Sequence, residues 1–195
     1  MLKEQLKDYN VILASGSPRR QQFFKELDLD FIIDVRSVEE LFPDHFKGTQ
    51  ITDHLSKLKA SVFTDLQPKD ILITSDTIVW HQSKALNKPQ DREEAYAMIS
   101  SLSGNTHEVI TSVCFTQKNK QHIINDTTKV TFKELTTEEI NYYIDNFQPY
   151  DKAGGYGIQE WFGYIAVTNI QGSYFNVMGM PLHKVYKMLM QITSS

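Results

Sequence analysis

Residues 10–24, NVILASGSPRRQQFF, pass from an apolar run into a glycine-containing turn and then into the start of a helix. The apolar run predicts a strand over 10–15. Pro18 suits the first position of a helix, and Ser17 before it suits the N-cap. Free backbone N–H groups and the positive end of the helix dipole make such a turn a site for an anion. The stretch therefore predicts an α/β protein with an anion site directly after its first strand.

Two adjacent arginines, Arg19 and Arg20, occupy the first turn of this helix. Positive charge there opposes the helix dipole, at a cost of about 0.3–1 kcal/mol. The placement is explained if an external anion such as a polyphosphate compensates both guanidinium groups. The alternative is that Ser-Pro is an ordinary cap and the arginines are solvated, and this stretch alone does not decide between the two.

The rest of the chain alternates strands and helices at first and then turns to paired strands. Period and composition predict strands over 10–15, 30–35, 70–80, 107–116 and 122–132, and a hairpin over 164–179. Helices are expected over 18–27, 50–66 and 92–102, after Thr136, and from Pro181 to the C-terminal region. We expect an α/β fold with a mixed twisted sheet and flanking helices, in which two lobes surround a central cleft. A single domain over 1–195 with no separate linker is predicted.

Composition limits the classes of protein to be considered. The chain has 195 residues, of which 41% are hydrophobic, and a formal net charge of -4. Extended nucleic-acid binding is unfavoured, because proteins that coat the phosphate backbone carry a basic surplus. The single cysteine, Cys114, lies in an apolar run and is expected to be a buried thiol, which excludes an internal disulfide. Because no apolar stretch is long enough for a membrane span and no signal peptide is evident, we expect a cytoplasmic protein without a membrane partner.

Asp76 stands inside the apolar run ILITSDTIVW, where a carboxylate is costly to bury unless it has a partner or a function. A metal ion or a proton-transfer role would account for it, and we favour these over an aspartate that caps the end of the strand. Lys59 lies roughly 60° from the centre of the apolar stripe of the helix over 50–66, whereas Lys57 lies about 140° away. Lys59 therefore borders the buried face, where it could either reach a cleft or simply extend its stem to solvent.

Further charged residues accompany a glycine-rich segment. Lys88 precedes a proline and is held extended, and Asp151 and Lys152 open the loop DKAGGYGIQ. The Asp-Lys pair is either an ion pair at a turn or part of a site that a ligand approaches closely. His107 is expected to be a hydrogen-bonded structural residue. No Walker A, HExxH, GxSxG or GxGxxG motif occurs, so the separated cations and carboxylates best suit metal-assisted attack on a phosphate ester.

Several segments together resemble the Maf family of nucleotide pyrophosphatases. They are, in chain order, LASGSPRR (13–20), VEE (38–40), LSKLKA (55–60), SDTIV (75–79), NKP (87–89), LSGNTHEVIT (102–111), YDKAGGYGIQ (150–159) and GSYFNVMGMPL (172–182). The resemblance covers nearly the whole chain. It implies a fold related to the inosine triphosphate pyrophosphatases, frequent homodimers, and hydrolysis of a nucleoside triphosphate to the monophosphate and pyrophosphate with Mg²⁺ or Mn²⁺.

The resemblance also implies roles for individual residues. Asp76 would accept the proton of the attacking water, and Glu40 and Asp76 would hold the metal. Substrate would be bound by Ser15, Arg19, Arg20, Lys59, Thr77, Lys88, Asp151, Lys152 and Gln159. Arg20, Thr77 and Gln159 match the family members that act on dTTP and UTP, and the Gln159 amide offers the donor and acceptor that the imide edge of uracil or thymine requires.

Two departures from the family pattern are small: Asn87 stands before KP in place of glycine, and Met180 stands where leucine is commoner. Neither is expected to abolish activity. Two alternatives remain open on sequence: a non-catalytic regulator of cell division that binds nucleotides or nucleic acid, and an enzyme with purine specificity. Modified pyrimidine nucleotides are further candidate substrates.

Overall fold

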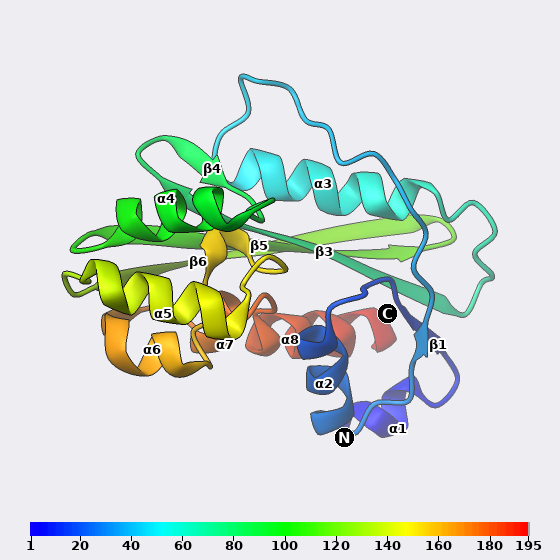
Figure 1. Ribbon diagram of the computed structural model, residues 1–195. Coiled ribbons are helices and arrows are strands. Elements are labelled where there is room, and N and C mark those ends of the chain that lie inside the picture. Colours follow the sequence, from blue (N-terminus) through cyan, green and yellow to red (C-terminus); the bar gives the residue numbers. More distant parts are fainter. Residues whose placement is uncertain (195) are drawn as a thin grey trace. The chain divides into compact units, whose positions relative to one another are not determined.

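The computed structural model describes residues 1–194 and contains a mixed sheet flanked by helices, as the sequence predicts (Figure 1). Within these residues the sheet has seven strands, ordered β2-β1-β3-β5-β6-β7, with β4 paired to β3. Their bounds are β1 Asn10–Leu13, β2 Ile32–Ile33, β3 Asp70–His81, β4 Lys84–Leu86, β5 Thr106–Gln117, β6 Lys120–Phe132 and β7 Val167–Gln171.

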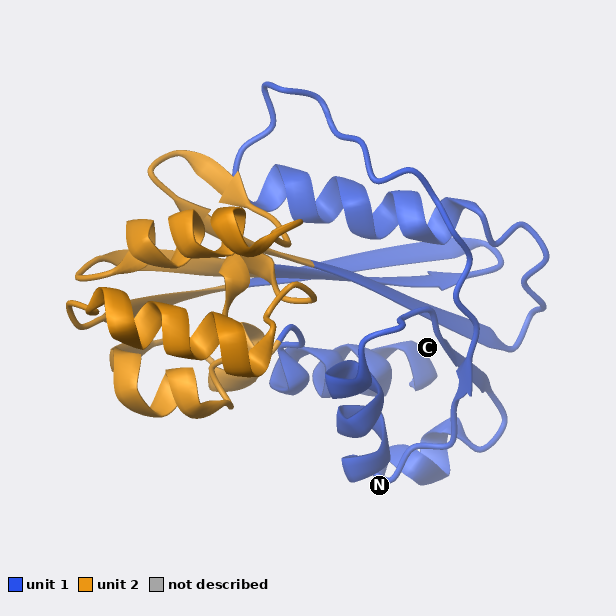
Figure 2. Ribbon diagram, viewed as in Figure 1, with its two compact units in different colours: residues 1–76, 111–126, 179–195 blue, residues 77–110, 127–178 orange. Residues whose placement is uncertain are grey.

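The chain divides into two compact units (Figure 2). Unit 1 comprises Met1–Asp76, Thr111–Asp126 and Gly179–Ser195, and unit 2 comprises Thr77–Ile110 and Thr127–Met178. The boundaries fall inside β3, β5 and β6, so these strands contribute residues to both units. The single two-lobed domain with a central cleft remains a prediction.

In unit 1, β1 lies between β2 and β3 and is parallel to both. The connection from β1 to β2 contains α2 (Pro18–Glu26), and the connection from β2 to β3 contains α3 (Thr49–Ser61). The two connections lead to opposite sides of β1, and right-handed crossovers then place their helices on opposite faces of the sheet, as Figure 1 shows. Ligands of open α/β sheets bind where the strand order reverses in this way, beyond the carboxyl end of the central strand.

Unit 1 is completed by two terminal helices. α1 (Leu2–Leu6) packs against α8 (Leu182–Thr193), and the Thr193 hydroxyl donates a hydrogen bond to the side chain of Gln5. Cys114 is free and buried, as predicted, and packs with Leu72 of β3 and Phe63 after α3. No helix of residues 1–194 is long and apolar enough to cross a membrane.

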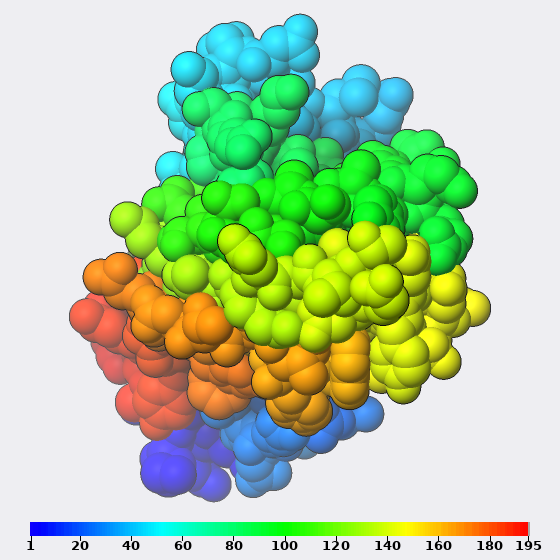
Figure 3. Space-filling view, turned by 60° about the vertical axis from the view of Figure 1, so that its left-hand side comes forward, coloured from blue at the N-terminus to red at the C-terminus, as the bar shows by residue number. Residues whose placement is uncertain are grey.

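Unit 2 has an aromatic core beneath α4 (Arg92–Leu102), α5 (Thr137–Phe147) and α6 (Trp161–Ala166). Phe132, Tyr156 and Phe162 pack edge to face or tilted, with ring centroids 4.9–5.7 Å apart. A short 3₁₀ turn, η1 (Ala153–Gly155), lies in the glycine-rich loop. Segment 161–177, orange in Figure 3, forms part of the surface of this unit.

Helix caps follow the sequence in part. The Asp91 side chain caps α4 at Glu94 N, and Thr136 and Glu139 form a complete capping box on α5. Ser17 occupies the N-cap of α2, but its side chain makes no cap bond.

Two sequence predictions are wrong in detail. The helix expected over 50–66 ends at Ser61. The hairpin expected over 164–179 is α6, β7 and then α7 (Tyr174–Val177). The buried Asn176 amide donates to Val109 O and Thr128 Oγ1, and Asn176 N donates to Ser173 Oγ, so this segment closes into a helical turn instead of a second strand.

His107 is structural, as expected. It is 2% exposed, one ring nitrogen lies 2.7 Å from Tyr156 Oη, and its ring packs on Phe132. Burial, aided by the charge of His81, lowers the pKa of His107 to about 3 from its ordinary value of 6.5.

Unfolding is therefore expected to become easier as the pH falls from about 6.5 toward 3, because only the unfolded chain gains the proton on His107 in that window. The contribution to the free energy of unfolding is up to about 1.4 kcal/mol per pH unit. Urea unfolding at pH 7, 6, 5 and 4.5 should give a smaller pH slope in His107→Gln than in the unchanged protein. Equal slopes would show that His107 does not titrate in this way.

Candidate active site

Asp76 is the residue of unit 1 that most clearly calls for a functional explanation. It lies in β3, which is buried on both faces, and is 7% exposed. Its Oδ1 accepts a hydrogen bond from Lys59 Nζ at 2.7 Å. Its Oδ2 is buried and has no hydrogen-bond partner within residues 1–194, and the neighbouring Ser75 Oγ shares that condition. A carboxylate with one oxygen fixed and the other unsatisfied is prepared for a ligand or a proton.

Lys59 joins two carboxylates. Its ammonium group lies 2.7 Å from Asp76 Oδ1 and 2.9 Å from Glu40 Oε2, and its side chain is 19% exposed. The Asp76 side chain is 9% exposed and the Glu40 side chain 53%, so the cation links a buried acid to a solvated one. The helical position predicted from the apolar stripe is confirmed: Lys59 reaches inward from α3, whereas Lys57 is exposed.

Arg20 fixes the backbone beside Asp76. Its Nε donates to Gly179 O at 2.9 Å and its Nη1 donates to Ser75 O at 3.1 Å. Burial lowers the pKa of Arg20 to about 10, and the negative charge of Asp76 acts in the opposite direction. This arginine therefore ties the turn after β1 and the segment before α8 to the peptide that carries the carboxylate. Its predicted binding of substrate stays a prediction.

The turn between β1 and α2 is held by its own polar groups. Ser15 is 5% exposed, its Oγ accepts from Ser17 N at 3.3 Å, and its carbonyl accepts from Gln21 Nε2 at 3.0 Å. Arg19 lies half-buried in the first turn of α2. These bonds fix the turn in which the sequence predicts an anion site.

In unit 2, Lys152 forms a buried ionic link instead of a free cation. It is 7% exposed, and its Nζ lies 2.6 Å from Asp151 Oδ1 and 3.1 Å from Glu160 Oε1. Tyr143 Oη donates to Glu160 Oε2 at 2.6 Å and accepts from Gly157 N at 2.9 Å. Burial, and then the bond to Glu160, raise the pKa of Tyr143. The network fixes both ends of the loop that contains Gln159.

Sequence reasoning did not single out Glu160 or Tyr143. The signal available for Glu160 was an acidic residue directly after the glycine-rich motif, eight residues beyond Lys152. Tyr143 carried no signal distinct from the apolar face of α5, because its hydroxyl acts in the core.

The NKP and AGG segments lie together. Gly154 N donates to Asn87 O at 3.0 Å, and Gly154 has a φ of +69°, with Val79 Cγ2 only 2.8 Å from where a Cβ would lie. Lys88 is exposed at this place. A side chain at Gly154 would disturb both the turn and β3.

Gln159 is half-buried, and its side-chain amide makes no hydrogen bond to another group of residues 1–194, whereas its carbonyl accepts from Tyr164 Oη at 3.3 Å. Close backbone approach supports this segment, since a Cβ on Gly163 would lie 1.8 Å from Ile158 O. Thr77, half-buried, follows Asp76 directly in β3. The Gln159 amide is therefore available to a ligand.

The predicted residues thus form two groups. Unit 1 brings together Glu40, Lys59, Asp76 and, through the backbone of Ser75, Arg20. Unit 2 pairs Asp151 with Lys152 and adds Glu160.

The donors in unit 1 fit a divalent cation that is shared with a substrate. Within residues 1–194 no group of three or more His, Cys, Asp or Glu side chains is placed to hold a metal. Among the described residues, Asp76 Oδ2 has no hydrogen-bond partner, and Glu40 forms an ion pair with Lys59, the lysine that also binds Asp76. Mg²⁺ is commonly bound by one or two carboxylates together with substrate phosphates, and this donor set matches that pattern.

Comparison with known proteins identifies the family of the chain. The family model described as "Maf-like protein" matches residues 10–192. A protein of Flavobacterium johnsoniae named dTTP/UTP pyrophosphatase is 60% identical over 190 residues, covering 97% of this chain and 98% of its own length. A protein of the same name from Bacteroides fragilis is 45% identical over 189 residues, covering 96% and 98%.

Among solved structures, the Staphylococcus aureus Ham1 protein aligns over 63% of this chain and 71% of its own, with a TM-score of 0.44 and 11% identity. At that level the similarity carries no statement about function. The match to the family model and the identity to these relatives extend over nearly the full chain, and the chain belongs to the Maf-like protein family.

Proposed function

We propose that this protein hydrolyses dTTP and UTP to the nucleoside monophosphate and pyrophosphate. The observation that carries the proposal is the buried Asp76, with Oδ1 fixed by Lys59 and Oδ2 unsatisfied. The relatives named dTTP/UTP pyrophosphatase support the same chemistry and the pyrimidine substrates. A cytoplasmic location would give such an enzyme its substrates, and a homodimer remains a prediction.

The reaction is attack of water on the α-phosphorus. Asp76 Oδ2 accepts a proton from the water while the oxygen of that water bonds to the α-phosphorus. The bond between the α-phosphorus and the oxygen that bridges it to the β-phosphorus breaks. Pyrophosphate leaves with the bonding electrons. Lys59 holds Asp76 in place through Oδ1 and offers positive charge to the phosphates, and Arg19 of the same unit supplies further charge to the triphosphate. The contribution of Lys88 to substrate binding stays a prediction. Arg20 positions the Ser75–Asp76 peptide.

Glu40 and Asp76 would hold a divalent cation, Mg²⁺ or Mn²⁺. When bound, such a cation supplies charge that the phosphate oxygens need as the leaving group departs. Glu40 is half exposed and so can change partner from Lys59 without a large desolvation cost.

Gln159 is assigned to recognition of the base, because its free amide offers both a donor and an acceptor. Gln159→Glu keeps the shape and removes the donor, so we expect kcat/KM for UTP to fall by about tenfold or more. Steady-state kinetics with UTP and CTP test the role, because the loss should be larger for UTP. An equal loss for both nucleotides would contradict an assignment to the imide edge.

The proposed reaction is tested with a nucleoside-triphosphate panel, in Mg²⁺ or Mn²⁺, with pyrophosphate and orthophosphate measured separately. Pyrophosphate from dTTP and UTP, exceeding that from purine nucleotides, is expected. Orthophosphate as the first product, or preference for a purine nucleotide, would contradict the proposal. A folded protein that is inactive on every nucleotide but binds DNA, with an affinity that falls steeply with salt, would favour the binding-only regulator.

A further inference from the structure

A second, basic pocket lies in unit 1, apart from Asp76. It has a volume of about 420 Å³ and lies where the turn between β5 and β6 meets the chain before β1 and the last turns of α8. Its lining residues are Tyr9, Pro68, Gln117, Lys118, Asn119, Lys120, His122 and Ile192. We call it the basic pocket. Pro68, two residues before the start of β3, lines the pocket. Asp76 lies six residues beyond Asp70, the first residue of β3, or about 20 Å along the strand at a rise of 3.3 Å per residue.

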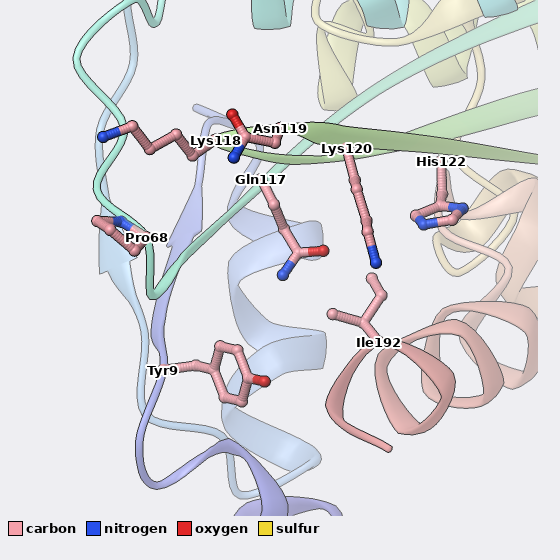
Figure 4. Close-up of a pocket in the computed structure, with 8 residues that line it drawn as sticks. All are labelled: Tyr9, Pro68, Gln117, Lys118, Asn119, Lys120, His122 and Ile192. Atoms are coloured by element: carbon pink, nitrogen blue, oxygen red, sulfur yellow. The ribbon is translucent and has the colours of Figure 1, made fainter. Parts of the chain in front are cut away.

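The polar groups of the basic pocket are free to bind. Within residues 1–194, the side chains of Tyr9, Gln117, Lys120 and His122 make no hydrogen bond or ion pair with another protein group. Figure 4 shows the Tyr9 hydroxyl, the Gln117 amide and the Lys120 ammonium group turned toward the same space. Side chains that converge without a protein partner are typical of a ligand site.

The two lysines of the turn differ in direction. Lys120 points toward Ile192, whereas the Lys118 side chain runs in another direction (Figure 4), although both residues line the pocket. Both are exposed, and only Asn119 separates them in the sequence. The exposed Lys57 of α3 lies outside the lining of the pocket and provides the matched control for the removal of one positive charge.

The chemistry of the lining indicates the class of ligand. Lys120 and His122 supply positive or hydrogen-donating groups, and no acidic side chain lines the pocket in the described part of the chain. The half-buried Tyr9 ring and the 7% exposed Ile192 supply apolar contact, and Gln117 and Asn119 offer donors and acceptors. The volume falls in the range of small-molecule sites, and the combination of an aromatic wall with phosphate-binding donors suits a nucleotide.

We propose that the basic pocket binds a nucleoside monophosphate, with its phosphate on Lys120 and His122 and its base against Tyr9. This site is separate from the one that carries out the proposed hydrolysis. Its existence does not depend on that reaction, although the reaction releases a ligand of this class.

Amide chemical shifts of the ¹⁵N-labelled protein, titrated with UMP, test the proposal directly. We expect saturable shifts in residues 117–122 and in Tyr9. Lys120→Gln should weaken the affinity by about tenfold, the cost of one charge-assisted hydrogen bond, whereas Lys57→Gln should leave it within about twofold. Pyrophosphate release from the nucleotide panel does not depend on these chemical shifts. A negative result in one experiment therefore leaves the other proposal standing.

Three outcomes would overturn the proposal. The absence of saturable shifts in 117–122 would show that UMP does not bind there. Equal loss in Lys120→Gln and Lys57→Gln would show only a general effect of charge. Uridine or inorganic phosphate alone, saturating the same amides at the same concentration as UMP, would show that the base and the phosphate are not both recognised.

Discussion

Pyrophosphate release by Asp76→Asn is expected to be about 10²–10⁴-fold slower than by the unchanged protein, the range attributed to a positioned general base. Asparagine keeps the shape of the side chain, and its amide oxygen can still accept from Lys59. The substitution therefore removes the proton-accepting oxygen Oδ2 with little change in packing. Single-turnover kinetics with UTP measure the chemical step.

Asp70→Asn is the matched control for this variant. Asp70 is also 7% exposed and also lies in β3, but it accepts from Gln67 N in a local turn and from Asn10 Nδ2 of the neighbouring strand β1. Its replacement should alter stability and leave the rate within a few fold. Turnover of Asp76→Asn close to that of Asp70→Asn would refute both the base and the metal-ligand roles of Asp76.

Lys59→Met is expected to lower kcat/KM for UTP by about 10–100-fold, since it leaves a buried carboxylate without its charged partner. Methionine keeps much of the apolar stem and removes the ammonium group that lies between Asp76 and Glu40. Steady-state kinetics across a range of Mg²⁺ concentrations separate loss of substrate binding from loss of rate.

Lys57→Met removes the same charge from the same helix at an exposed position. Its kinetics should stay within about twofold of the unchanged protein, because exposed single charges contribute little. If the two variants behave alike, Lys59 acts only through the net charge of α3, and the bridge has no role in the reaction.

The sequence did not predict β4, and the anion site of the turn after β1 stays a prediction. It was sufficient for the long strands β3, β5 and β6 and for the position of Lys59. Each of these rests on local periodicity: the continuous apolar run of β3 predicts a buried strand, and the angle around α3 places Lys59 at its border. The pairing of Lys59 with Asp76 needed the fold, because the contact joins a helix to a strand 17 residues further along the chain.

Other features depend on tertiary contacts that a linear pattern does not contain. Arg20 donates to the carbonyl of Gly179, 159 residues away. The segment expected to complete a hairpin instead forms α7, because Asn176 finds buried partners at Val109 and Thr128. Glu160 acquires its role through Lys152, to which it is linked across the glycine-rich loop.

Hydrolysis of UTP in water enriched with ¹⁸O tests the central claim most directly, because it identifies the phosphorus atom that the water attacks. Attack at the α-phosphorus predicts one ¹⁸O atom in each UMP and none in pyrophosphate, as measured by mass spectrometry after a single turnover. Label found in pyrophosphate and absent from UMP would place the attack at the β-phosphorus and contradict the account.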